Sequence, residues 1–307
     1  MKSKRLAILA LISASIIWGL TGPIMKQTLV HVPIFTLAFI RFGAAALLLF
    51  PFVYNKLTIK KEDLPLLILC AAFGVTFNIA FFFLGLTLTS ALNTGMIIST
   101  IPIVTLIFGA LFLKEKITKK LIIGGIFGLL GIGIIIGKDV LQNGLYISPI
   151  GDFIILISMF SFVIYEILSK KLFKKYHPLT ITFYAFLIGS ISFFPASFYE
   201  FRNVQNWMAN LPLSAILGII YGIFFSSLSA YSLWQWGLSK IDVSRAGFFF
   251  YLDPIASTLG AVLILSEKIT EPFILGAILI FLGLFFAEGR LPYHLLVELK
   301  NKLQNHS

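Results

Sequence analysis

Two charged residues stand inside long apolar stretches of this chain, where an unpaired charge is costly if the stretches cross a membrane. Arg41 falls within the stretch 34–54, and Asp253 falls within the stretch 244–265. At 1.5 Å per residue, their positions along the two helices differ by on the order of 6–8 Å. If the helices are neighbours, the two charges pair with each other or bind the opposite charges of a zwitterionic solute. A purely structural ion pair is the alternative.

A second group of residues combines aromatic rings with hydrogen-bonding side chains at helical spacing. Tyr231, Trp234 and Gln235 follow Ser227 at intervals of four, seven and eight residues, which places them on one face of a helix. Such a set predicts an aromatic small-molecule pocket with few polar groups. Hydrogen bonding between helices, with aromatic rings filling gaps, is the alternative. The candidate substrate-binding residues are Trp18, Asn78, Phe82, Thr94, Tyr165, Tyr231, Trp234 and Gln235.

The remaining chemistry-bearing residues do not form a catalytic or metal-binding pattern. The one cysteine, Cys70, lies in an apolar stretch, and the four histidines fall in loops or the tail. The motifs of serine hydrolases, zinc proteases and nucleotide-binding loops do not occur. The sequence therefore predicts a protein that is not an enzyme and uses no cofactor or metal. Glu166, about one turn from the end of its stretch, is a gate or proton-site candidate, but we expect it to extend to the membrane interface near Lys170.

The elements that must position these residues are membrane helices. Hydrophobic residues make up 58% of the chain and charged residues 12%, against about 25% charge in a soluble domain. Ten apolar stretches are each long enough to cross a bilayer, at roughly 20 residues per crossing. The sequence predicts an all-α integral membrane fold of ten transmembrane helices. Their expected limits are 6–25, 34–54, 64–86, 91–113, 119–137, 150–169, 179–199, 213–238, 244–265 and 272–289.

The ten stretches form two copies of a five-helix unit. The tetrapeptide Glu-Lys-Ile-Thr occurs at 115–118 and again at 267–270, an offset of 152 residues, and Pro102 and Pro254 precede it in the two copies. An odd number of crossings makes the second copy enter the membrane from the other side, as in inverted-topology transporters. We expect repeats at 1–140 and 150–290, with Pro102 and Pro254 as gating kinks around a shared site. Prolines that only shape the bundle are the alternative.

Basic residues set the orientation. Nineteen of the 24 Lys and Arg residues fall in segments on the side of the N-terminus, and four fall on the other side. This bias predicts that both termini are cytoplasmic and that the net charge of +11 reflects topology and lipid contact, not nucleic acid. The tail 291–307 carries Leu295, Leu299 and Leu303 on one stripe, which predicts an amphipathic helix on the inner membrane surface. Six glycines in 124–137 allow close helix packing, within a monomer or in a weak homodimer.

Several short motifs resemble those of the EamA-type transporters of the drug/metabolite transporter superfamily. They are Trp18-Gly19 in the first stretch, Arg41 in the second, Leu-x-Glu-Lys after the fourth and ninth, and Leu252-Asp253-Pro254, where the family more often has glutamate before the proline. The resemblance covers essentially the whole chain. It implies a cavity lined by helices one to four and six to nine, with the fifth and tenth at the periphery. It also implies small metabolites such as amino acids as substrates, often moved outward.

Together these patterns predict a secondary transporter in the cytoplasmic membrane, an exporter, which moves small organic metabolites such as amino acids by alternating access at a central cavity. A facilitative channel, or a lipid-associated scaffold without coupled transport, is the alternative.

Overall fold

The computed structural model of the protein describes residues 2–89, 91–143, 148–204, 207–209, 211–265 and 271–288. Over these ranges the chain forms helices and turns, and they contain no strand. The second Glu-Lys-Ile-Thr segment, 267–270, and the tail 291–307 lie outside the described residues.

The helices follow the expected apolar stretches in order. Those of the first half are α1 (Lys2–Thr28), α2 (Ile34–Val53), α3 (Leu64–Ala71), the π-helical segment η3 (Ala72–Phe77), α4 (Asn78–Leu88), α5 (Ala91–Ile98), α6 (Ile101–Leu113) and α7 (Lys119–Asn143). Those of the second half are α8 (Pro149–Leu172), α9 (Pro178–Asn203), α10 (Leu213–Tyr221), the π-helical segment η4 (Gly222–Tyr231), α11 (Ser232–Leu238), α12 (Val243–Ala246), the 3-10 segment η5 (Gly247–Tyr251), α13 (Leu252–Leu265) and α14 (Glu271–Glu288). Two short 3-10 turns, η1 (Tyr54–Lys56) and η2 (Lys61–Asp63), join α2 to α3.

Six of the described helical runs are long and apolar enough to cross a bilayer by themselves. They cover Ser3–Thr28, Ile34–Lys56, Lys61–Leu88, Pro149–Leu172, Pro178–Asn203 and Leu213–Leu238. The helices at Ile101–Leu113 and Ile274–Ala287 are apolar but shorter. The fold is therefore that of a helical membrane protein.

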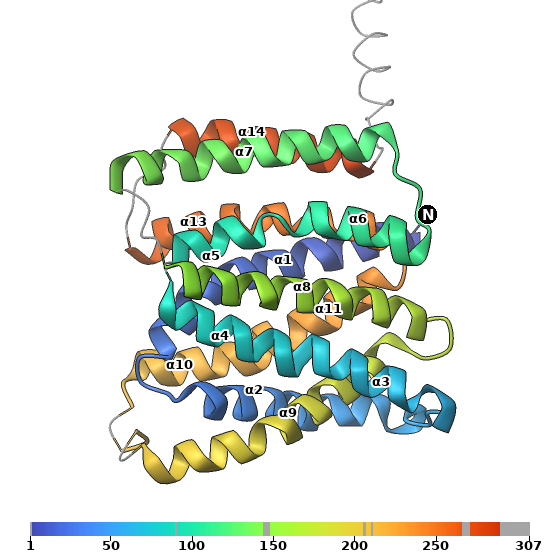
Figure 1. Ribbon diagram of the computed structural model, residues 1–307, viewed down its shortest axis with the longest axis vertical. Coiled ribbons are helices and arrows are strands. Elements are labelled where there is room, and N and C mark those ends of the chain that lie inside the picture. The colour runs from blue at the N-terminus through green and yellow to red at the C-terminus, as the bar shows by residue number, and fades with distance from the viewer. Residues whose placement is uncertain are drawn as a thin grey trace, which may run out of the picture.

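The helices lie side by side with their axes nearly parallel (Figure 1). α7 packs on α14 at one edge of the bundle, and α2 packs on α9 near the other edge. Between these pairs, α1 contacts α11, η4 and α13, while α8 contacts α4, η3, α5 and α6. The centre of the bundle is therefore built by α1 and α8 together with the interrupted helices.

Four helical runs are interrupted near their middle. The segment expected over 64–86 contains η3, and the segment expected over 213–238 contains η4. The segment expected over 91–113 is divided between α5 and α6, and Pro102 lies in the first turn of α6, where its missing N–H leaves no helical hydrogen bond unmade. The segment expected over 244–265 is divided among α12, η5 and α13, with Pro254 in the first turn of α13. Irregular helix of this kind frequently marks a functional site.

The glycines of α7 bring it close to its neighbours within the chain. A Cβ atom on Gly124 would lie 2.6 Å from the carbonyl oxygen of Gly283 in α14, and one on Gly131 would lie 2.5 Å from that of Gly276. Gly128 faces the ring of Tyr251. Packing inside the monomer thus accounts for Gly124, Gly128 and Gly131, whereas a Cβ atom on Gly133 would meet nothing within 4 Å.

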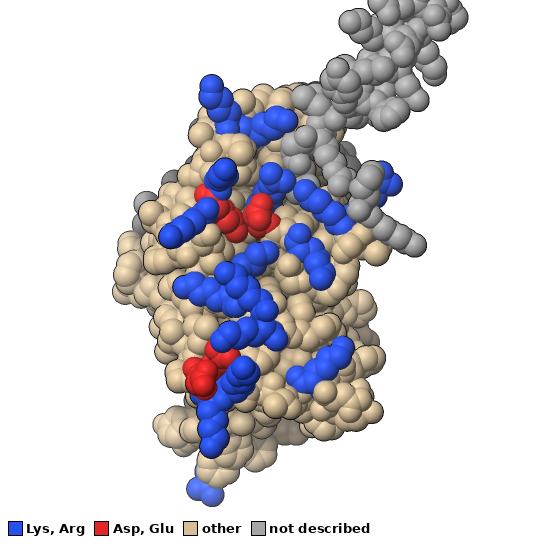
Figure 2. Space-filling model, turned by 90° about the vertical axis from the view of Figure 1, so that its right-hand side faces the viewer, with Lys and Arg blue, Asp and Glu red and all other residues tan. Residues whose placement is uncertain are grey.

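One end of the bundle, which we call the basic end, gathers most of the Lys and Arg side chains that are visible in Figure 2. The turns at this end join α2 to α3, α6 to α7, α8 to α9 and α11 to α12. An ion pair between Lys175 and Asp63, 2.7 Å apart, and one between Arg245 and Asp242, 3.7 Å apart, lie here. Basic side chains are therefore spread widely over this face.

Candidate functional site

A cavity of about 100 Å³ lies between the two halves of the chain. Six predicted site residues line it, and they are Trp18, Arg41, Asn78, Phe82, Tyr231 and Asp253. The other lining residues that the structure describes are Thr21, Ile79, Ile98, Ile101, Ile155, Ser158, Met159, Phe162, Ser226 and Phe250. Typical ligand pockets measure roughly 300–1,000 Å³, so this conformation admits only a small solute without further opening.

Arg41 reaches the cavity from α2 and is almost completely buried. Its Nη2 atom donates to the hydroxyls of Ser226 at 2.9 Å and Ser227 at 3.2 Å, and its Nε atom donates to the carbonyl of Gly222 at 3.3 Å. All three acceptors belong to η4, whose altered helical spacing presents two successive serines to the guanidinium group. They are neutral, so the positive charge of Arg41 is positioned but not neutralised by them.

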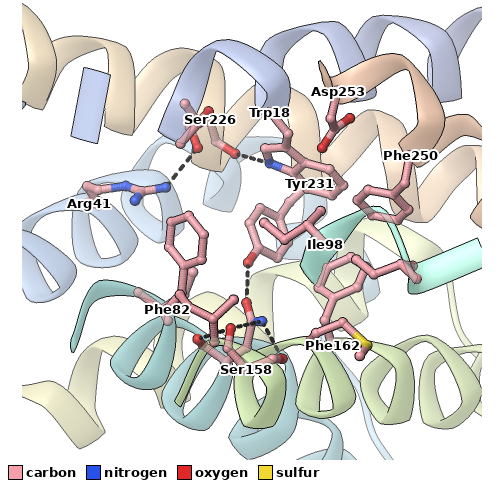
Figure 3. Close-up of a pocket in the computed structure, with 16 residues that line it drawn as sticks. Trp18, Arg41, Phe82, Ile98, Ser158, Phe162, Ser226, Tyr231, Phe250 and Asp253 are labelled. Atoms are coloured by element: carbon pink, nitrogen blue, oxygen red, sulfur yellow. Dashed lines mark hydrogen bonds between the residues drawn. The ribbon is translucent and has the colours of Figure 1, made fainter. Parts of the chain in front are cut away.

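Asp253 enters the same cavity from the first turn of α13, on the other side of Trp18 and Tyr231 (Figure 3). Its Oδ1 atom is buried and has no hydrogen-bond partner among the described residues. Gly19 lets α1 approach this turn closely, because a Cβ atom there would lie 2.5 Å from the carbonyl oxygen of Asp253. The cavity therefore presents a carboxyl group with unused hydrogen-bonding capacity.

Arg41 and Asp253 do not contact each other. The ion pairs of the described residues involve Asp63 and Asp242, both at the basic end, and the direct pair expected as one alternative is not formed. The two groups instead occupy opposite sides of one cavity (Figure 3). Because buried charges are stabilised by an opposite charge, a solute carrying both signs would complement the pair better than a neutral one.

A polar network joins the halves at the cavity wall opposite Arg41 and Asp253. The amide Nδ2 of Asn78 donates to the carbonyl and hydroxyl oxygens of Ser158 at 3.0 and 3.1 Å, and the Ser158 hydroxyl donates to the Asn78 carbonyl at 2.8 Å. The Tyr231 hydroxyl donates to Oδ1 of Asn78 at 3.4 Å. Asn78 is the first residue after η3, so both π-helical segments border polar contacts of the site.

Aromatic rings close the cavity between these polar groups. The ring centroid of Trp18 lies 5.2 Å from that of Tyr231, 5.6 Å from that of Phe162 and 5.8 Å from that of Phe250. The indole Nε1 of Trp18 donates to the carbonyl of Ser226 at 3.1 Å. The contacts with Tyr231 and Phe162 are edge-to-face and the contact with Phe250 is stacked, and such contacts fix the orientation of the rings.

Other predicted residues lie behind this wall. Trp234 is completely buried, 4.5 Å from Phe250 and 5.2 Å from Trp18 between ring centroids, and so supports the lining instead of forming it. Tyr165 packs at 6.4 Å from Tyr231, also fully buried. Gln235 is buried with both amide atoms unpartnered among the described residues, and Thr94 is buried in α5. The helical period placed Tyr231, Trp234 and Gln235 on one face, but in this structure only Tyr231 of the three reaches the cavity.

Glu166 does not extend to the membrane interface, and that expectation is wrong. The side chain is fully buried, and its Oε1 atom accepts a hydrogen bond from the indole Nε1 of Trp234 at 2.9 Å. Lys170 does not accompany it, because its ammonium group donates to the carbonyls of Leu238 and Ile241, both at 2.6 Å. The carbonyls at the end of α11 and in the turn after it bind the Lys170 ammonium group, and Glu166 stays buried in the bundle.

Sequence reasoning also missed the roles of Ser226 and Ser158, which fix Arg41 and Asn78. Their signal was weak because serine is common in membrane helices. No group of three or more His, Cys, Asp or Glu residues suited to a metal ion occurs in the described part of the chain.

Comparison with known proteins defines the class. The model of the EamA-like transporter family matches residues 5–137 and 149–288. A crystal structure that is 18% identical matches with a TM-score of 0.75, over 92% of this chain and 96% of the other, and shows the same fold. The class is therefore that of multi-pass membrane transporters, not enzymes. The chain belongs to the EamA-like transporter family.

Relatives with this architecture come from bacteria and archaea. A protein of Archaeoglobus fulgidus named as an uncharacterized transporter is 30% identical, over 87% of this chain and 93% of its own length. The uncharacterized transporter YyaM of Bacillus subtilis is 29% identical over 91% and 92% of the two chains. A probable amino-acid metabolite efflux pump of Escherichia coli is 26% identical over 92% and 94%.

Proposed function

We propose that this protein is a secondary transporter that exports amino acids or related zwitterionic metabolites across the cytoplasmic membrane by alternating access. Ten transmembrane helices would form two five-helix repeats of inverted topology, at 1–140 and 150–290. The observation that carries the proposal is the placement of Arg41 and Asp253 on opposite sides of one buried aromatic cavity.

The paired interruptions support the inverted repeat. At the offset of 152 residues, η3 (Ala72–Phe77) corresponds to 224–229, which lies inside η4. At the same offset, the break before Pro102 corresponds to the break before Pro254. The family model matches two consecutive ranges of similar length. Interrupted helices at matching places in both halves are typical of transporter sites.

The contacts between helices support the same arrangement. The packing of α1 on η4 and α11 has its counterpart in the packing of α8 on η3 and α4. The contact of α1 with α13 has its counterpart in that of α8 with α5 and α6. The pairs α2 with α9 and α7 with α14 join equivalent helices. A two-fold axis in the membrane plane would produce all of these relations.

Orientation and conformation follow from the basic end. The positive-inside rule favours a cytoplasmic location for this end, and therefore for both termini. There the Glu115 carboxylate, at the end of α6, accepts the N–H groups of Val243 at 2.9 Å and Ser244 at 2.8 Å and also bonds the Ser244 hydroxyl. These bonds tie the two halves together on the cytoplasmic side. In alternating access they would break when the cavity opens to the cytoplasm.

The substrate class follows from the charges. The guanidinium group of Arg41 suits a carboxylate, and the Asp253 carboxylate suits an ammonium group. The small cavity and aromatic walls favour a compact solute with an apolar side chain. The efflux direction comes from the name of the E. coli relative and is applied to this chain only as part of the proposal.

Counterflow in proteoliposomes tests this function. Vesicles loaded with a mixture of unlabelled amino acids should accumulate labelled amino acids transiently, and the initial rate should saturate with concentration. Sugars and nucleobases serve as the comparison panel. Flux that does not saturate and shows no counterflow would indicate a channel, and no flux of any panel member would favour a scaffold role.

A further inference from the structure

We propose that Glu166 is a proton-binding site that couples transport to the proton gradient, separate from the substrate cavity. This inference rests on the proposed transporter function and assigns its coupling ion. Asp253 is the acidic residue of the cavity, whereas Glu166 lies one turn beyond Phe162 along α8, toward the basic end.

The surroundings of Glu166 favour a neutral carboxyl group. Its side chain has no exposed surface, Oε1 accepts the single bond from Trp234, and Oε2 has no partner among the described residues. An ionised carboxylate with one neutral donor is strongly disfavoured in an apolar interior. A bound proton removes that charge and supplies a donor.

Among the described residues, no cation from the elements packed around α8 compensates the carboxyl group. Within α8, Tyr165 is neutral, and Lys170 is held by the carbonyls of Leu238 and Ile241. From the end of α6, Glu115 contributes a like charge. In the turn between α11 and α12, Asp242 and Lys240 act on Lys170. From α3, Cys70 contacts Ser169 at 3.3 Å.

Trp234 connects this carboxyl group to the cavity. Its indole N–H bonds Glu166, while its ring packs against Trp18 and Phe250, both of which line the cavity. A change of charge on Glu166 therefore changes the hydrogen bond that orients a ring directly beneath the substrate. This is a short physical path between proton binding and solute binding.

The coupled step is a simple proton exchange. In this conformation the basic end is closed, and the Glu166 carboxyl group carries one proton. When the bonds of Glu115 to α12 break and water enters from the cytoplasm, the O–H bond ionises and the proton leaves to that side. The cavity then binds a solute from the cytoplasm, and the solute-loaded protein returns to the present conformation with the carboxyl group ionised. After the solute leaves to the other side, the carboxylate takes up a proton from that side, so that one proton enters for each solute exported.

A substrate-free measurement tests the proton site. Infrared spectra of the purified protein at neutral pH should contain a carbonyl band of a buried protonated carboxylic acid. Glu166→Gln should lower the intensity of this band by the contribution of one carboxyl group, whereas the same change at an exposed position, Glu62→Gln, should leave it unchanged. Any contribution from Asp253 is common to all three proteins. Equal band intensity in the wild type and Glu166→Gln would overturn the proposal.

If Glu166→Gln does not fold, Trp234→Phe gives the same test. It removes the donor that stabilises the ionised carboxyl group, so the band should titrate at higher pH than in the wild type. An unchanged titration would overturn the assignment.

Transport separates coupling from substrate choice. With the membrane potential held at zero, one-for-one exchange under a gradient of one pH unit sustains about a tenfold amino-acid gradient. A tenfold difference in proton concentration and a tenfold difference in amino-acid concentration store the same free energy. The wild type and Glu62→Gln should reach it, and Glu166→Gln should reach none. A tenfold gradient in Glu166→Gln would refute the coupling role. If no panel amino acid moves in the wild type, the proposed substrate fails, while the infrared result still decides the proton site.

Discussion

Replacing Asp253 with asparagine removes the acidic group of the cavity and changes the cavity volume very little. Because Oδ1 has no partner among the described residues, the substitution should break no hydrogen bond made by that atom. In the bound state, the Asp253 carboxylate would accept a hydrogen bond from the ammonium group of the substrate. A hydrogen bond to a charged group contributes about 1.5–3 kcal/mol. Its loss corresponds to roughly 10- to 150-fold weaker binding, at 1.4 kcal/mol per decade.

The assay is ligand-dependent thermal stabilisation of purified protein, because a ligand that binds the folded state raises its stability with the logarithm of concentration. We expect Asp253→Asn to keep or raise the melting temperature without ligand and to need a correspondingly higher amino-acid concentration for the same shift. The matched control is Asp242→Asn at the basic end, far from the cavity, which should bind as the wild type does.

A thermodynamic cycle makes this test specific to the ammonium contact. Each amino acid that stabilises the wild type is compared with its deaminated acid, which lacks the ammonium group. The wild type should bind the amino acid roughly 10- to 150-fold more tightly than the deaminated acid, and Asp253→Asn should lose most of that preference. An equal preference in both proteins would refute the placement of the ammonium group at Asp253.

Three further predictions concern the basic end and the core. Glu115→Ala should lower stability by about 0.5–2 kcal/mol, the usual effect of losing a helix N-cap, and a melting temperature equal to that of the wild type would contradict the role of this carboxylate at α12. Cys70 is fully buried, so a maleimide should label it only after unfolding, and rapid labelling of the folded protein would contradict its position. The hydrogen bond with Asp63 raises the pKa of Lys175 above its usual value of about 10.4, so its stabilising contribution is complete below that pH and is lost as pH rises through the higher folded value. The difference in melting temperature between the wild type and Asp63→Asn should therefore shrink above that pH, and a constant difference would argue against this pair.

The sequence predicted the helical membrane fold and most of the cavity because both depend on simple patterns. Long apolar stretches have few alternatives to a membrane helix, and Arg41 and Asp253 stood out because charge inside such a stretch is rare. Trp18, Asn78, Phe82 and Tyr231 were identified by residue type and spacing, and all four line the cavity.

The placements that differ from the sequence analysis result from aromatic packing at the cavity wall and from local competition for hydrogen bonds. A regular helical period placed Trp234 and Gln235 on the same face as Tyr231, and α11 keeps that period. Trp234 nevertheless lies behind the rings of Trp18 and Phe250, which line the cavity in front of it. Glu166 was expected at the interface near Lys170 because it lies about one turn from the end of its apolar stretch. The ammonium group of Lys170 instead donates to the carbonyls of Leu238 and Ile241. No sequence pattern predicts which acceptors a lysine ammonium group will bind.

Side-specific labelling of two equivalent helix starts tests the central claim most directly. Lys119 opens α7 and Glu271 opens α14, at the offset of 152 residues, and both are exposed. Single cysteines introduced as Lys119→Cys and Glu271→Cys, in a chain with Cys70→Ser, are treated on intact cells with a membrane-impermeant thiol reagent. The antiparallel arrangement of two halves around one cavity predicts that Glu271→Cys reacts and Lys119→Cys reacts only after the cells are opened. Reaction of both from the same side would contradict it.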